Sequence, residues 1–256
     1  MERNVKTLAY INLYAILGNL ETLCKLDSEA AKLANTKTGK DISIAFNVTD
    51  GPTGKLVFSK GACKFVPEDL RASITLKFFS NEKFNDLIDG KKVMPFPYGN
   101  IFKLGFVQKN FTELTNILTK YLRASEEDLK DKEFFDKSTE LMFNLIVAAI
   151  AQIGNHDKLG KTSAKRIVDG QVSFEIKNVA KAYIDVKDHK LTFHRGEAPN
   201  PRSFMIFDST ETARSLFDGK MDAMTCIARG KIEMKGHIGQ IDNINRILGR
   251  VGFYLA

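Results

Sequence analysis

The sequence predicts an α+β protein of two tandem domains, each a mostly antiparallel sheet covered by helices. One observation is an internal repeat, because residues 87–91 (LIDGK) return as residues 216–220 (LFDGK), an offset of 129 in a chain of 256 residues. A second is that each half runs from a helical pattern through alternating strands to a closing helix. Solenoid repeats span about 20 to 50 residues, so this offset indicates two related domains. A charged stretch near residue 125 places them at residues 1–124 and 125–256.

The first half contains four predicted strands and four predicted helices. Its strands, which are rich in alternating apolar residues, are residues 42–48, 56–58, 74–78 and 101–107. Its helices, which have apolar residues at helical spacing or recognisable caps, are residues 5–25, 28–34, 80–90 and 111–122. Ser80 is the expected N-cap and Gly90 the expected end of the third helix. Pro95 and Pro97 exclude a regular helix between this helix and the next strand.

The second half repeats this order. Ser125 with Asp128 is typical of a capping box that opens a charged helix. The predicted strands are residues 172–176, 182–186, 191–193, 204–207 and 231–235. The further predicted helices are residues 140–153, 208–219, 223–229 and 238–255. We expect the last of these to act as a lid over the apolar face of the sheet.

Composition and charge narrow the class of protein. Apolar residues make up 43% of the chain and charged residues 27%, as in globular proteins. Residues 1–125 hold 18 Lys and Arg against 12 Asp and Glu, a net charge of +6, whereas the remainder holds 20 against 19. A basic half suits an anionic membrane surface, a phosphorylated ligand or nucleic acid. The basic residues form no run of five, which favours an ordinary solvated surface.

The cysteines indicate the compartment. Cys24, Cys63 and Cys226 cannot all pair with one another, and none lies in a CxxC motif. This usage favours buried, reduced thiols in the cytoplasm. The first ten residues contain no signal-peptide pattern.

Residues 204–238 (FMIFDSTETARSLFDGKMDAMTCIARGKIEMKGHI) resemble the sterol carrier protein family, type two. The family pattern has a glycine that ends one helix, then a small helix, then a strand like GKLKIKG. Gly219-Lys220 and residues 230–236 (GKIEMKG) stand at those places. The first half keeps the helix end at residues 87–91, but its prolines interrupt the small helix, so we interpret it as a diverged copy. The domains are therefore expected to be sterol-carrier-like.

The resemblance implies an apolar tunnel between sheet and helices that binds fatty acid, fatty acyl-CoA or a sterol-like ligand without catalysis. Methionine is flexible enough to line such a wall. The expected lipid-binding residues are Phe207, Leu216, Phe217, Met221, Met224, Ile227, Ile232, Met234, Ile238 and Ile241. The competing interpretation of the same residues is plain core packing, with the repeat serving self-association. A third interpretation is an accessory or catalytic module for acyl-CoA metabolism.

No catalytic or metal-binding constellation is found in the sequence. His156, His189, His194 and His237 form no metal-ligand spacing, and no nucleophile elbow, P-loop or dinucleotide fingerprint is present. Interleaved basic and aromatic residues typical of nucleic-acid binding are also missing. We expect no catalytic residues, no cofactor, no metal and no nucleic-acid partner. The expected partners are a lipid or acyl-CoA and, transiently, a membrane surface, with the oligomeric state left open.

Overall fold

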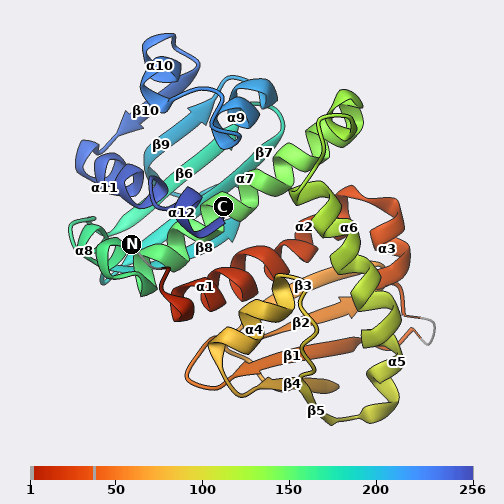
Figure 1. Ribbon diagram of the computed structural model, residues 1–256. Coiled ribbons are helices and arrows are strands. Elements are labelled where there is room, and N and C mark those ends of the chain that lie inside the picture. Colours follow the sequence, from red (N-terminus) through yellow and green to blue (C-terminus); the bar gives the residue numbers. More distant parts are fainter. Residues whose placement is uncertain (1–2, 37–38, 256) are drawn as a thin grey trace. The chain divides into compact units, whose positions relative to one another are not determined.

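The computed structural model describes residues 3–36 and 39–255. The chain divides into two compact units, residues 1–125 and 126–256, one residue from the boundary expected from the sequence. Each unit is a five-stranded, mostly antiparallel sheet with helices packed on one face (Figure 1). The fold is therefore α+β, as predicted, with two units in tandem.

The sheet of the first unit has the strand order β3-β2-β1-β4-β5. Its strands are β1 (Ile42–Val48), β2 (Thr53–Ser59), β3 (Ala62–Pro67), β4 (Ile74–Phe78) and β5 (Phe96–Gly99). β1 and β4 are parallel, and the other neighbours are antiparallel. Inward residues such as Leu56 and Phe58 are buried, whereas Lys55 and Val57 face outward. This alternation fixes which face the helices cover, because each buried Phe or Leu contributes about 1.5–3 kcal/mol.

The helices of the first unit begin with one long helical run. It comprises α1 (Val5–Ile11), a π-turn (Asn12–Ile16), a 3₁₀ turn (Leu17–Asn19) and α2 (Leu20–Leu26). The others are α3 (Ser28–Ala34), α4 (Asn81–Ile88), α5 (Leu104–Phe106) and α6 (Thr112–Leu122). A buried hydrogen bond of 2.9 Å from Asn12 Nδ2 to Asn85 Oδ1 joins the first run to α4.

The second unit has the same topology, with the order β10-β9-β6-β7-β8. Its strands are β6 (Gly170–Ile176), β7 (Ala180–Lys187), β8 (Lys190–Arg195), β9 (Pro201–Phe207) and β10 (Ile232–Gly236). Its helices are α7 (Lys132–His156), α8 (Lys158–Ala164), α9 (Thr210–Phe217), α10 (Ala223–Ala228), α11 (Ile238–Leu248) and α12 (Val251–Leu255). β6 and β9 form the parallel pair, in the place that β1 and β4 take in the first unit.

The repeated Asp-Gly-Lys sequence ends a helix in each unit. Gly90 and Gly219 both lie in the left-handed region, with φ of 81° and 68°. In each case the N–H of the following lysine donates to the carbonyl five residues earlier, at 2.9 Å. This is the Schellman arrangement, for which glycine is preferred. The repeat therefore marks equivalent helix ends.

Two sequence predictions are wrong. Residues 101–107 are helical rather than a strand, because the Asn100 side chain accepts a hydrogen bond from the Phe102 N–H and starts a helix that continues into α6. Ser125 and Asp128 are followed only by a short 3₁₀ helix (Asp128–Lys130) and not by the long charged helix. α7 instead begins at Lys132, where the Asp131 carboxylate accepts from the Phe134 N–H at 2.7 Å.

Among the described residues, no helix is both long and apolar enough to cross a membrane.

Candidate lipid-binding site

The inner face of strands β9 and β10 supplies an apolar wall. Ile232 lies opposite Phe207 in the register, and Met234 lies opposite Met205. Phe207 and Ile232 are only 3% and 2% exposed. From α9, the ring of Phe217 meets the ring of Phe207 edge to face, with centroids 5.8 Å apart. Strand alternation thus places four apolar side chains on the face that the helices cover.

Helix α9 is held over this wall by a cap and a buried cation. The Ser209 hydroxyl accepts from the Thr212 N–H at 3.2 Å. Arg214, which is 7% exposed, donates to Ser138 Oγ on α7 at 2.7 Å and to Asp218 Oδ1 at 2.9 Å. A buried charge is tolerated when it is paired and hydrogen-bonded in this way. No local sequence pattern identified Arg214, because its partner on α7 lies 76 residues away.

An open pocket lies where β6 and β9 end and β10 begins. Its volume is about 410 Å³, within the usual range for small-molecule sites. Its lining combines apolar side chains with a charged rim: Lys177, Ile206, Asp208, Ile227, Gly230, Lys231, Ile232, Glu233 and Met234. A hydrogen bond from Lys235 and the nearby charge of Lys177 lower the pKa of Glu233.

Helix α10 is held to the rest of the unit mainly by one buried side chain, that of Cys226. The Asp222 carboxylate caps it by accepting from the Thr225 N–H at 2.8 Å, and Cys226 is its one fully buried residue. Met224 is 75% exposed and Met221 is half-buried. The methionines of this segment therefore lie at the rim of the wall rather than inside it.

The start of α11 is fixed to β9 by a buried polar network. Gln240, which is 0% exposed, accepts from Ser203 Oγ at 2.7 Å and donates to the Val168 carbonyl at 2.8 Å. His237 Nδ1 accepts from the Gln240 N–H. Ile238, in contrast, is 83% exposed.

The end of the C-terminal segment is fixed by Asp157, which is 4% exposed. Its carboxylate accepts from Arg250 Nη2 at 3.0 Å and from the Tyr254 hydroxyl at 2.7 Å, and it lies 2.7 Å from Arg250 Nε as an ion pair. It also caps α8 through the Leu159 and Gly160 N–H groups. Burial alone would raise the pKa of Asp157, but the hydrogen bonds and the charge of Arg250 outweigh it and hold the pKa below its usual value.

The ten predicted lipid-binding residues thus fall into separate groups. Ile227, Ile232 and Met234 line the open pocket, and Phe207 and Phe217 pack against each other on the inner face. Leu216, Met221 and Ile241 are half-buried. Met224 and Ile238 are exposed. The sequence did not predict the charged rim of the pocket, because Lys177 and Asp208 are distant in the chain and become neighbours only through the pairing of β6 and β9.

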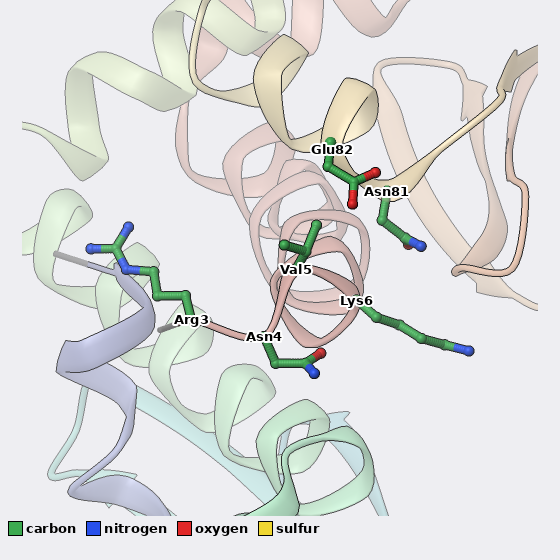
Figure 2. A pocket seen from close by; sticks show the side chains of 6 residues that line it. All are labelled: Arg3, Asn4, Val5, Lys6, Asn81 and Glu82. Atoms are coloured by element: carbon green, nitrogen blue, oxygen red, sulfur yellow. The ribbon is translucent and has the colours of Figure 1, made fainter. Parts of the chain in front are cut away.

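The first unit has a pocket of different character, about 460 Å³, at the starts of α1 and α4. It is lined by Arg3, Asn4, Val5, Lys6, Asn81 and Glu82. Figure 2 shows the side chains of Arg3 and Lys6 extending to opposite sides, so they do not converge on one point. Among the described residues, no group of three His, Cys, Asp or Glu side chains is placed to hold a metal.

Comparison with known proteins finds a family similar to part of the second unit. Residues 150–249 match the model of the SCP-2 sterol transfer family, which confirms the resemblance found in the sequence. The match covers 100 of the 256 residues, all within the second unit, and shows that this part of the chain is similar to sterol-transfer domains. No curated protein matches the chain.

Several solved structures are similar to part of the chain. Sterol carrier protein 2 from Yarrowia lipolytica (apo form) is 23% identical over 41% of this chain and 88% of its own, with a TM-score of 0.32. Sterol carrier protein domain 2 of Helicoverpa armigera is 17% identical over 44% and 91%, with a TM-score of 0.34. Palmitated SCP2L2 from Aedes aegypti is 20% identical over 40% and 90%, with a TM-score of 0.32.

Proposed function

We propose that the second unit binds and carries a fatty acid, fatty acyl-CoA or sterol-like ligand without catalysis. The observation that carries the proposal is the family match over residues 150–249, which contain both the apolar wall and the open pocket. Burial of an apolar ligand against this wall would drive binding at about 25 cal/mol per Å². The charged rim, with Lys177 and Lys231, suits a carboxylate or phosphate head group.

The proposal includes a membrane contact and a cellular location for the carrier. Transfer of a lipid requires a transient contact with a membrane surface, which supplies or receives the ligand. Cys24, Cys63 and Cys226 are all buried thiols, which supports a reducing, cytoplasmic location. The first unit is interpreted as a diverged copy of the second.

Native mass spectrometry of the full chain tests the proposal, with fatty acid, acyl-CoA and sterol offered in turn. Met234→Glu places a carboxylate on the apolar wall and is expected to weaken binding by about tenfold or more. Val179→Glu makes the same change at an exposed turn (40% exposed) and is the matched control, with wild-type uptake expected.

Three outcomes would contradict the proposal. If the wild-type protein takes up none of the three ligands, the proposal is contradicted. A ligand-free dimer whose interface depends on Met234 supports the self-association alternative. Release of free CoA from acyl-CoA by the protein supports the enzymatic alternative.

A further inference from the structure

The most exposed apolar side chains of the first unit gather around strand β5. Met94 and Phe102 are 94% and 91% exposed, among the highest values for large apolar side chains in the described residues. We call this surface the edge patch, and its members are Phe79, Met94, Phe96, Tyr98, Ile101 and Phe102. Exposed large apolar side chains that gather in one region usually mark an interaction site.

The fold holds these side chains outward. In the register, Phe96 lies opposite Lys77, whose side chain is on the outer face of the sheet. The rings of Phe79 and Phe96 lie 6.4 Å apart, and Lys77 Nζ lies 5.3 Å from the centre of the Phe79 ring. The outer face of β4 and β5 therefore carries a mixed aromatic and cationic surface.

The helix start after β5 projects two more apolar residues. The Asn100 N–H donates to the Ser73 carbonyl at 2.8 Å, and its side chain accepts from the Phe102 N–H at 3.1 Å. These bonds fix the turn that presents Ile101, 60% exposed, and Phe102 in the first helical turn. Both side chains are thus held in water by a defined backbone.

The chemistry of the strand disfavours a partner strand as the occupant. β5 is an edge strand of the sheet, but Pro97 has no N–H and Pro95 directly precedes the strand. Prolines on an edge prevent pairing with another chain. A surface that needs no directional hydrogen bonds, such as a bilayer, fits the patch better.

The net positive charge near the edge patch favours a bilayer that contains anionic lipids. Residues 89–112, from the end of α4 to the start of α6, hold four lysines and one acidic residue, and Lys91 is paired with Asp86 at 2.6 Å. The corresponding stretch of the second unit at the offset of 129, residues 218–241, holds four basic and three acidic residues. Lysines beside an apolar patch are attracted to anionic lipid head groups, at about 1 kcal/mol per charge near the surface.

We propose that the edge patch docks the first unit on an anionic lipid bilayer, with Met94, Ile101 and Phe102 entering the interface between head groups and acyl chains. Tyr98 and Phe96 suit the same depth, since aromatic side chains favour the membrane interface. The inference extends the membrane contact of the proposed function by naming the surface. It does not depend on ligand binding by the second unit.

Co-sedimentation of the full chain with vesicles of phosphatidylcholine, with or without phosphatidylserine, tests the inference. Binding is expected only to the anionic vesicles and should weaken as salt is added. Phe102→Ser and Met94→Ser are each expected to reduce partitioning by about tenfold. Lys92→Gln should reduce it by about fivefold.

Matched controls come from elsewhere in the chain. Leu159→Ser removes a 48% exposed apolar side chain on α8, and Lys60→Gln removes an exposed charge beside β3, at the opposite edge of the same sheet. Both should bind vesicles like the wild type. Circular dichroism melts of every variant establish that the fold is retained.

The inference is overturned if patch variants and controls bind alike, or if phosphatidylcholine alone binds equally well. It is also overturned if light scattering shows that the patch variants turn a dimer into a monomer, because the patch is then a protein interface. Native mass spectrometry separates the two proposals. Vesicle binding by a wild-type protein that carries no lipid refutes the proposed function and leaves the docking surface standing.

Discussion

Replacing Asp157 with asparagine should destabilise the second unit by about 3 kcal/mol. The carboxylate is 4% exposed and meets Arg250 at 2.7 and 3.0 Å and Tyr254 at 2.7 Å. Asparagine keeps one oxygen for the cap of α8, but it removes the charge that pairs with Arg250. Breaking a buried pair costs about 3–5 kcal/mol, and the lower end applies because the Arg250 side chain is 18% exposed.

The same carboxylate gives the prediction a pH dependence. Its pKa is lowered in the folded state, so the stabilisation is present above the unfolded pKa of about 3.9 and is lost as the pH falls through the folded pKa. The stability difference between wild type and Asp157→Asn should therefore be constant between about pH 5 and 7 and shrink below about pH 4.

Urea denaturation of the full chain measures this difference, with the transitions of the two units fitted separately. Hydrogen exchange should show faster opening of residues 238–255 in the variant. Arg246→Gln is the control on α11, because its pair with Asp242 is 56% exposed on both sides and should contribute less than about 0.5 kcal/mol. An Asp157→Asn effect no larger than this control, or one that persists unchanged at pH 3, would refute the reasoning.

Two further changes test how the second unit is held together. Arg214→Met should lower the free energy of unfolding in urea by about 3 kcal/mol, because Asp218 loses its buried partner. Lys220→Gln, the control, should change it by less than about 0.5 kcal/mol. Equal effects of the two substitutions would contradict the role of the buried cation. Gly236→Ala should cost about 2 kcal/mol or more, because φ is 101° and a Cβ would lie 2.0 Å from the Arg202 carbonyl oxygen. Gly219→Ala, with φ of 68° and no atom within 4 Å, should cost about 1 kcal/mol, and the reverse order would count against this account.

Local patterns predicted most of the fold. Strand alternation located β1, β4, β7 and β9, because apolar residues at every second position line the face that the helices cover. Glycine after an acidic residue located the ends of α4 and α9, because the left-handed conformation there is a local requirement. Such signals are carried by a few neighbouring residues, so they can be read from the chain.

The errors arise where distant contacts decide the structure. Residues 101–107 alternate like a strand, but the Asn100 cap and the hydrogen bond to Ser73 start a helix instead. β3 was missed because its outward positions include the apolar Ala62 and Val66 beside the inward Cys63 and Phe65, so the strand lacks clean alternation. The charged rim of the pocket could not be predicted without the strand order, which places Lys177, after β6, and Lys231, before β10, on either side of β9.

The anchors of the C-terminal segment bear on how a ligand would reach the apolar wall. The sequence suggested that residues 238–255 form a lid, but α11 is tied to β9 through Gln240 and α12 is tied to Asp157 through Tyr254. Lifting this segment would expose two buried polar networks, each costly to leave unsatisfied. Within α10 itself, Cys226 is the one fully buried side chain. Because segments with few buried contacts open at the lowest cost, α10 is the element whose movement would admit a lipid with the least loss of stability.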